Sequence, residues 1–151
     1  MKKLVLVLIL CLSSFSFANW KIIDTFDEFQ EPSGEKCIFS IDSSNFGLCR
    51  IQKNPKVDGQ YVVILAPNEY IGGDFTVVKV KIDDLEPFSF KGAVVREFVG
   101  FVFNENDTNL LKLLSKGKTL KITIRKFDDT TILQKHDLNG FTKVFEEYSR
   151  N

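Results

Sequence analysis

Alternation of apolar and polar side chains is the feature that most constrains the fold of this chain. Residues 118–126 place Leu120, Ile122 and Ile124 on one side and mainly basic side chains on the other. Residues 75–82 repeat the pattern, with Val78, Val80 and Ile82 opposite lysines. A period of two is typical of a β-strand with one buried face. The sequence therefore predicts a mainly β protein.

Further strands and their turns can be placed around these two segments. Residues 36–41 and 48–52 flank a turn-rich stretch and predict a hairpin, and residues 131–136 return as the partner of 118–126 after Asp128-Asp129. Apolar runs at 60–66 and 97–103 predict buried strands. We expect an antiparallel β-sandwich.

Two short helices are expected to interrupt or follow the strands. Asp107 is a candidate N-cap for an inserted helix carrying Leu110, Leu111, Leu113 and Leu114, with Gly117 as its stop. Residues 139–149 predict a C-terminal helix, with Asn139 as its cap. Phe141, Val144, Phe145 and Tyr148 form one apolar stripe that should cover the open end of the sheet.

The first 18 residues predict a secretory signal peptide. Lys2 and Lys3 precede the apolar run 4–12, and Ser16-Phe17-Ala18 supplies small residues for a peptidase, so cleavage is expected between Ala18 and Asn19. A retained membrane anchor is the alternative, but serines interrupt the run well before the ~20 apolar residues that a span needs. The mature chain, 19–151, is expected to be one domain without a membrane span, and periplasmic or secreted.

The balance of charges limits the classes of partner. The whole chain has zero formal net charge, and removal of two lysines leaves the mature part at about −2. Nucleic-acid binding requires a concentrated basic surface. This balance predicts that nucleic acid is not a partner.

Two cysteines remain after cleavage, because Cys11 lies in the signal peptide. Cys37 and Cys49 fall near the open end of the first predicted hairpin. In an exported protein one pair of cysteines most often forms a disulfide. No Cys-x-x-Cys motif supports the alternative of a metal pair. The prediction is a Cys37–Cys49 disulfide.

Phenylalanine is abundant in the mature chain. Fifteen occur in all, and Phe15 and Phe17 belong to the signal peptide, so thirteen remain. An aromatic-rich core is the favoured interpretation. The alternative is a pocket for a hydrophobic ligand.

No catalytic or metal-binding set stands out. His136 is the only histidine, no nucleophile motif accompanies it, and its neighbour Asp137 should point to the opposite face, so a surface or strand-end position is expected. Asp83, Asp84 and Glu86 predict a solvated turn. Residues 104–108 resemble a calcium loop only briefly, because Asn109 and Ser115 occupy the positions where glycine and glutamate are required.

Three segments carry a resemblance to a known family. They are Val-Val-Lys-Val-Lys-Ile-Asp-Asp at 77–84, Leu-Leu-Ser-Lys-Gly-Lys-Thr-Leu-Lys-Ile-Thr-Ile at 113–124, and His-Asp-Leu-Asn-Gly-Phe-Thr-Lys-Val-Phe at 136–145. With the signal peptide, Trp20 and the early cysteine pair, the chain resembles small exported β-sandwich proteins of the invasion-associated locus B type and similar type VI secretion accessory proteins. The resemblance implies an envelope-associated, non-enzymatic protein.

These observations predict a mainly β, antiparallel sandwich with one short inserted helix, a C-terminal helix and one disulfide. The leading hypothesis is a non-enzymatic exported interaction module of the cell envelope that binds an envelope or surface protein through an exposed edge strand. A carrier of a hydrophobic small molecule or lipid is the first alternative, and a hydrolase dependent on His136 is the second. No catalytic residue, cofactor or metal is assigned.

Overall fold

The structure is a computed structural model that describes residues 19–26, 29–42 and 44–151. The predicted signal peptide, including Ala18 of the expected cleavage site, lies outside the described residues. Asn19 is exposed at the start of the described part, directly before the first strand.

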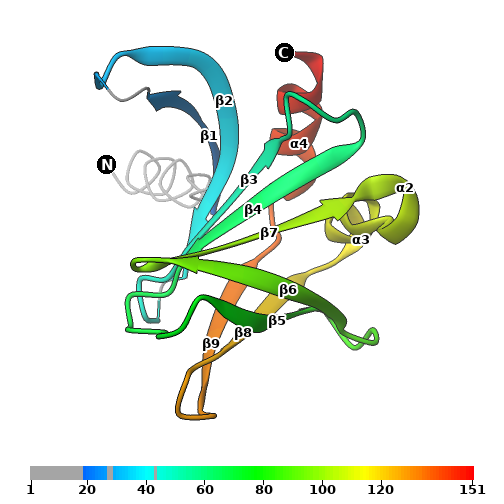
Figure 1. Cartoon of the computed structure of the whole chain (residues 1–151). Helices are drawn as coiled ribbons and strands as arrows, with labels where there is room; N and C mark the ends of the chain where they lie inside the picture. Colours follow the sequence, from blue (N-terminus) through cyan, green and yellow to red (C-terminus); the bar gives the residue numbers. More distant parts are fainter. Residues whose placement is uncertain (1–18, 27–28, 43) are drawn as a thin grey trace, which may run out of the picture.

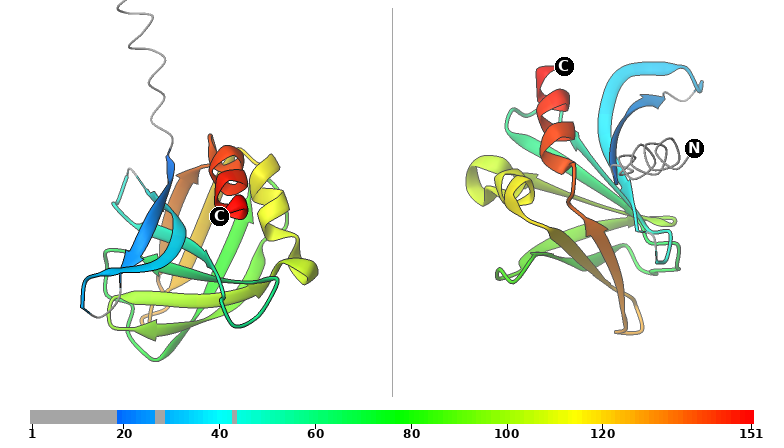
Figure 2. Two further views of the ribbon diagram at one scale, coloured as in Figure 1. Left: turned by 90° about the horizontal axis from the view of Figure 1, so that it is seen from above. Right: turned by 180° about the vertical axis from the view of Figure 1, so that it is seen from behind.

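Nine strands form one antiparallel sheet in the order β1-β2-β3-β4-β7-β6-β5-β8-β9. Figure 1 and Figure 2 show that this sheet curls strongly around its own interior. The strands are β1 (Trp20–Phe26), β2 (Pro32–Ile41), β3 (Leu48–Lys53), β4 (Gln60–Ala66), β5 (Phe75–Ile82), β6 (Phe88–Val95), β7 (Phe98–Asn104), β8 (Thr119–Arg125) and β9 (Thr131–Asp137).

The mainly β, antiparallel class is confirmed, and so are the β2–β3 and β8–β9 hairpins. The predicted arrangement of two packed sheets is not confirmed, because one continuous ladder connects all the strands. Its continuity depends on β4 pairing with β7 and β5 pairing with β8. Alternation shows that a strand has one buried face, which is equally true in a sandwich and in a curled sheet.

The predicted inward residues of β5 and β8 do line the interior. Val78 and Ile124 are fully buried cross-strand partners, as are Val80 and Ile122 at 3% and 1% exposure. Aromatic rings fill the neighbouring part of the core, where Phe90 and Phe101 stack with centroids 4.6 Å apart. The interior of the curled sheet is therefore the hydrophobic core.

The phenylalanine prediction is only partly right. Phe101, Phe103 and Phe141 are buried. Six of the thirteen are exposed, and their exposed fractions range from 47% to 77%; they are Phe26, Phe29, Phe46, Phe75, Phe98 and Phe127. The high phenylalanine content therefore serves the surface as well as the core.

The inserted helix is split into α2 (Glu105–Thr108) and α3 (Leu110–Lys116) by Asn109, which has a left-handed backbone. Asn104 caps α2 by accepting from the Asn106 N–H, so the proposed capping role of Asp107 was wrong. Gly117 ends α3 as predicted. Leu110, Leu111 and Leu114 are buried.

The C-terminal helix α4 (Phe141–Arg150) begins after Gly140, which has a positive φ of 84°, and Asn139 does not cap it. Its apolar stripe packs as predicted, with Phe141 and Tyr148 buried and Val144 and Phe145 packed against the core. The helix contacts β1, β2 and α3 at one end of the curled sheet (Figure 2).

The predicted disulfide is not formed, since both Cys37 and Cys49 are buried free thiols. Cys49 pairs with Ser40 in the β2–β3 ladder, three residues from Cys37. Because side chains alternate along a strand, this register puts the two cysteines on opposite faces of the sheet. Three residues also separate their Cα atoms along the strand by about 10 Å, beyond the ~7 Å that a disulfide tolerates.

Candidate functional site

The two edge strands of the curled sheet, β1 and β9, approach each other without forming a ladder. Side chains from β1 and from the connection between β2 and β3 bond the outer backbone groups of β9 instead. Trp20 Nε1 donates to the Asp137 carbonyl at 2.7 Å, the Lys135 N–H donates to Asp42 Oδ2 at 2.6 Å, and Asn45 Nδ2 donates to the Leu133 carbonyl at 2.9 Å. We call this junction the seam, defined by Trp20, Asp42 and Asn45 on one side and residues 133–137 on the other.

A buried polar network lies on the inner side of the seam. His136 Nδ1 is 3.0 Å from Ser40 Oγ, and His136 Nε2 is 3.1 Å from Gln134 Oε1. Because the amide oxygen only accepts, Nε2 carries the proton and the Ser40 hydroxyl donates to Nδ1. The indole of Trp20 packs beside the imidazole, with ring centroids 5.8 Å apart.

Burial sets the protonation of this network. Desolvation lowers the pKa of His136 to about 4, although the nearby Asp42 carboxylate acts in the opposite direction. Burial alone would raise the pKa of Asp42, but hydrogen bonds from Ser44 and from the Lys135 N–H outweigh it, and the pKa lies below its ordinary value. At neutral pH the seam therefore holds a neutral imidazole and an ionised carboxylate.

His136 lies at a strand end, one of the two expected positions, because it is the residue before the last of β9, but it is buried there. Instead of lying at the surface, it contacts a hydroxyl, as the base of a hydrolase does. However, Ser40, His136 and Gln134 are exposed by only 1%, 2% and 0%. A substrate cannot reach the Ser40 oxygen without opening the seam, and an imidazole with a pKa near 4 is a weak base. The geometry supports a structural role.

The acidic residues also have local structural partners. Asp83 accepts hydrogen bonds from the Lys118 and Thr119 N–H groups, so it fixes the start of β8. Asp84 and Glu86 are exposed in the same loop. Among the described residues, no group of three or more His, Cys, Asp or Glu side chains is placed to hold a metal ion. Nor does any described helix have the length and apolar character needed to span a membrane.

The other edge of the sheet forms a projecting arm. The β2–β3 ladder begins only at Ile38, while β2 continues its pairing with β1 as far as Pro32. We define the arm as the described residues of 23–36. Tyr148 of α4 lies where β2 leaves β3, and its hydroxyl accepts from the Lys53 N–H at 2.8 Å. A surface cavity of about 300 Å³ lies between β2, β3 and α4.

The arm carries exposed apolar side chains. Ile23, Phe26 and Phe29 are 38%, 64% and 77% exposed. In the described part of the chain, β1 is paired on one side only, with β2. Figure 1 shows the β1–β2 hairpin extending away from the other strands. This is the candidate interaction site.

Sequence reasoning did not find the seam, because its members come from β1, β2, the β2–β3 turn and β9. A weak signal was present. Ser40, Gln134 and His136 occupy inward positions of their strands, and Gln134 and His136 continue the alternation that starts at Ile132. Polar residues at inward positions are expected to bond one another.

Comparison with known proteins gives one informative similarity. Searches of protein families and of curated proteins find no match. Among solved structures, the chain is similar to the crystal structure of invasion associated protein B from Bartonella henselae. The TM-score is 0.60, the sequence identity is 14%, and the match covers 89% of this chain and 94% of that chain. The resemblance to the invasion-associated locus B type is thus confirmed as a similarity of fold.

Proposed function

We propose that this protein is an exported interaction module of the cell envelope that binds a partner protein by adding a strand to β1. The observation that carries the proposal is the difference between the two edges of the sheet. The outer backbone groups of β9 are bonded at Leu133, Lys135 and Asp137, whereas β1 is paired only with β2 among the described residues.

An unpaired edge offers a row of backbone donors and acceptors to an extended segment of another chain. Natural edge strands are commonly blocked by charges or bulges, and β1 has one register shift, between Asp24 and Phe26. Ile23 and Phe26 nevertheless leave apolar surface beside the edge. Backbone bonds would supply affinity, and contacts with these side chains would supply specificity.

Export rests on the sequence of residues 1–18, with cleavage between Ala18 and Asn19. The similar fold belongs to a protein whose name describes it as invasion-associated, which supports a role at the cell envelope or outside the cell. The N-terminal sequence of the protein recovered from the periplasm or the medium tests this part. An N-terminus at Asn19 is expected, and retention of Met1 in the cytoplasm would contradict export.

The experiment on β1 places a photo-crosslinking residue at Ile23 in living cells, with Val102 as the matched control site. Val102 is also apolar and exposed (52%), but it lies on β7, which stands between β4 and β6 and is not an edge strand of the sheet. We expect a discrete crosslinked protein at Ile23 and none at Val102.

Two substitutions then test whether the apolar edge is required. Phe26→Asp should abolish the crosslink formed at Ile23, while Val102→Asp should leave it unchanged. Equal crosslinking from both sites, or a crosslink that survives Phe26→Asp, would exclude β1 as the binding edge.

The carrier alternative receives less support from the packing. Phe90 stacks on Phe101, and Tyr61 on Phe103 with centroids 5.6 Å apart, so these rings fill the interior where a ligand would lie. The hydrolase alternative fails on the burial of Ser40 and His136 described above.

A further inference from the structure

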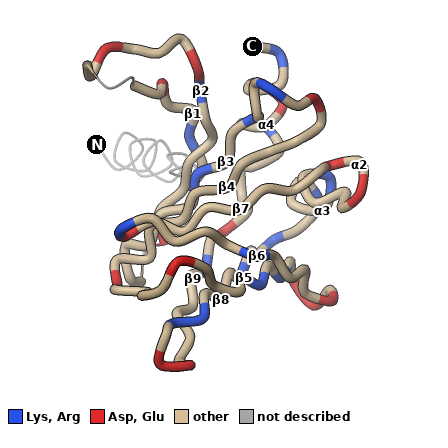
Figure 3. Tube along the Cα trace, viewed as in Figure 1, with Lys and Arg blue, Asp and Glu red and all other residues tan. Residues whose placement is uncertain are grey.

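The outer face of the last four strands of the sheet is strongly basic. Its strands are β6, β5, β8 and β9, which are neighbours in that order. Figure 3 shows lysine and arginine along this part of the sheet. We define the basic face by six residues on this side: Lys79, Lys81, Lys91, Lys121, Arg125 and Lys135.

The strand register brings three of these lysines into one row. Lys81 of β5 is the direct partner of Lys121 of β8, and Lys121 is the direct partner of Lys135 of β9. Like charges directly opposite each other destabilise a sheet. Lys79 lies on the same face of β5, two residues before Lys81. Lys91 of β6 is the direct partner of Val77 of β5 and therefore lies on this face too.

Few acidic side chains lie at the outward positions of these strands. The acidic residues nearby are in the loops at the strand ends: Asp83, Asp84, Glu86, Asp128 and Asp129. None of the five lysines has an acidic side chain within 4.0 Å among the described residues, while Arg125 pairs with the exposed Asp129 of the β8–β9 turn. Asp137 is the acidic residue at an outward strand position here, and it accepts from the Asn139 N–H. The chain as a whole has no net charge, so positive charge is concentrated on this face.

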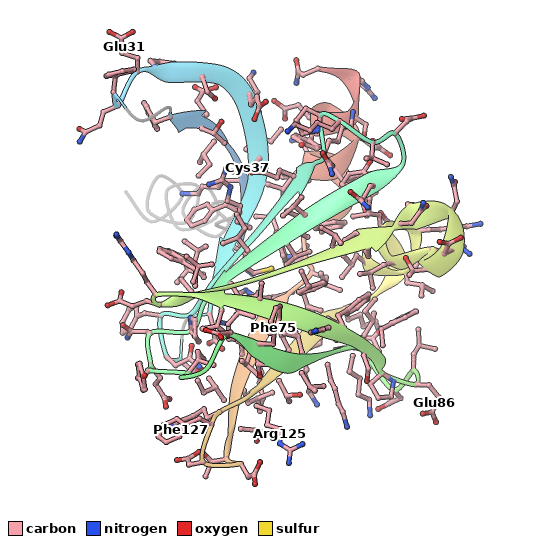
Figure 4. The ribbon with its side chains drawn as sticks, in the orientation of Figure 1. Glu31, Cys37, Phe75, Glu86, Arg125 and Phe127 are labelled. Atoms are coloured by element: carbon pink, nitrogen blue, oxygen red, sulfur yellow. The ribbon has the colours of Figure 1, made fainter. Side chains whose placement is uncertain are left out.

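Exposed aromatic side chains border the basic face at one end. Phe75, Phe127 and Tyr70 are 61%, 68% and 70% exposed. The ammonium of Lys91 lies 4.0 Å from the centre of the Phe75 ring, and Figure 4 shows Phe75, Arg125 and Phe127 on this side of the molecule. A surface cavity of about 560 Å³ lies here, and its lining includes Phe75, Lys91, Arg125 and Phe127.

The position of Phe127 is fixed by its surroundings. Its N–H donates to the Ile71 carbonyl at 3.0 Å, and its ring meets Tyr70 edge to face at 5.9 Å. Gly72 packs so close that an added Cβ would lie 2.7 Å from the Phe127 ring. The structure therefore holds a large apolar side chain in solvent beside a cationic surface.

We propose that the basic face, with Phe75 and Phe127 at its border, binds the surface of an anionic phospholipid bilayer. Lysines near such a surface are attracted to its phosphate groups, and aromatic rings insert at the level of the headgroups. The proposal concerns a different surface from β1, and the two proposals share only the assumption of export.

Lipid is favoured over nucleic acid for two reasons. Five of the six cations are lysines, which act as point charges on dispersed phosphates, whereas arginine is preferred for bidentate recognition. The charges also lie across four strands instead of along an element that could enter a groove. The prediction that nucleic acid is not a partner relied on the net charge, which does not report how charge is distributed.

The test is co-sedimentation of residues 19–151 with vesicles. This segment contains every strand, every helix and the whole core that the structure describes. Vesicles of phosphatidylglycerol and phosphatidylcholine in equal parts are compared with vesicles of phosphatidylcholine alone. We expect binding to the anionic vesicles only, and weaker binding as salt is raised.

The key variant changes the lysine row: Lys81→Glu, Lys121→Glu and Lys135→Glu together. The matched control changes three exposed lysines elsewhere, Lys56→Glu, Lys112→Glu and Lys143→Glu, and so alters the net charge equally. At about one kcal/mol for each lysine near the surface, the row variant should lose roughly 100-fold in affinity. The three control lysines lie outside the basic face, so the control variant should lose far less affinity than the row variant.

Further variants separate binding from folding and from bulk charge. The neutral triple variant, Lys81→Gln, Lys121→Gln and Lys135→Gln together, places no like charges opposite one another. It should still bind weakly, with an unfolding midpoint near that of the parent. Phe127→Ser should weaken binding without changing its salt dependence.

Equal losses in the row and control variants would overturn the proposal, as would no difference between anionic and neutral vesicles. Tighter binding to duplex DNA than to the vesicles at the same salt would replace lipid by nucleic acid. Because Ile23 and Phe26 are unchanged throughout, these outcomes are separate from those of the β1 crosslinking.

Discussion

At the scale of single residues, His136 shows how burial decides which role a side chain can play. The sole histidine of the chain invites a catalytic interpretation, yet it is 2% exposed and bonded to Ser40 and Gln134. Its neighbours satisfy both ring nitrogens of a neutral imidazole. We infer that His136 stabilises the seam.

The low pKa of His136 predicts a pH dependence of stability. The unfolded chain takes up a proton near pH 6.5, whereas the folded chain does so only near pH 4. Between these values the unfolded state binds more protons, so the free energy of unfolding should fall as pH falls, by up to about 3 kcal/mol at pH 4.

Urea unfolding from pH 7 to pH 4 measures this dependence. In His136→Asn the pH dependence of the free energy of unfolding that comes from the histidine should be missing. The pH dependence that comes from the carboxylates is present in both proteins and should remain. At pH 7 that variant should be less stable by about 1–3 kcal/mol, because Ser40 and Gln134 lose a buried partner. Parallel pH profiles for the two proteins would show that His136 is not buried and neutral.

The cysteines give a second prediction at this scale. Burial raises the pKa of Cys49 to about 12, and burial also raises the pKa of Cys37 despite the opposing effect of Arg50. Because the thiolate is the reactive form, both should react slowly with a thiol reagent in the folded protein. In denaturant without reductant, two thiols per mature chain should react rapidly. A count of zero would establish the disulfide.

At the scale of elements, the sequence predicts which residues form strands better than it predicts which strands pair with one another. The alternation at 75–82 and 118–126 identifies β5 and β8 and their inward residues. It does not reveal that these two strands pair, because the partners in their ladder are far apart in the sequence. The nearest two, Ile82 and Leu120, are 38 positions apart (120 − 82). The seam was inaccessible for the same reason: Trp20 and Asp137 meet only after the sheet has curled.

Trp20→Phe tests whether the side-chain bonds hold the seam. The substitution keeps an aromatic ring beside His136 and Phe141 but removes the donor to the Asp137 carbonyl. We expect a loss of about 1–2 kcal/mol in the free energy of unfolding. The matched control, Phe39→Leu, changes an aromatic side chain of β2 that takes no part in the hydrogen bonds of the seam. A smaller loss of stability for Trp20→Phe than for the control would show that the hydrogen bond from Trp20 to Asp137 does not stabilise the fold.

Tyr148→Phe tests the attachment of the arm. The hydroxyl of Tyr148 satisfies the Lys53 N–H, which β2 leaves without a ladder partner. Loss of that acceptor should cost about 1 kcal/mol and make the Lys53 amide exchange faster. Exchange at Cys49, which pairs with Ser40 inside the β2–β3 ladder, should stay unchanged and serves as the internal control.

At the scale of the whole molecule, average properties conceal how residues are distributed. Zero net charge coexists with a face of six cations, and a high phenylalanine content is divided between a stacked core and exposed positions. Composition could not separate these cases, because which side of each strand faces outward depends on how the whole sheet curls.

The unequal protection of the two sheet edges is the central claim, and residue-resolved amide hydrogen exchange tests it most directly. The Lys135 N–H, bonded to Asp42, should exchange slowly, and Asp42→Ala should accelerate it selectively. The amides of β1 that do not pair with β2 should exchange rapidly in the protein alone. Rapid exchange at Lys135 in the parent protein, or protection of every β1 amide, would contradict the account.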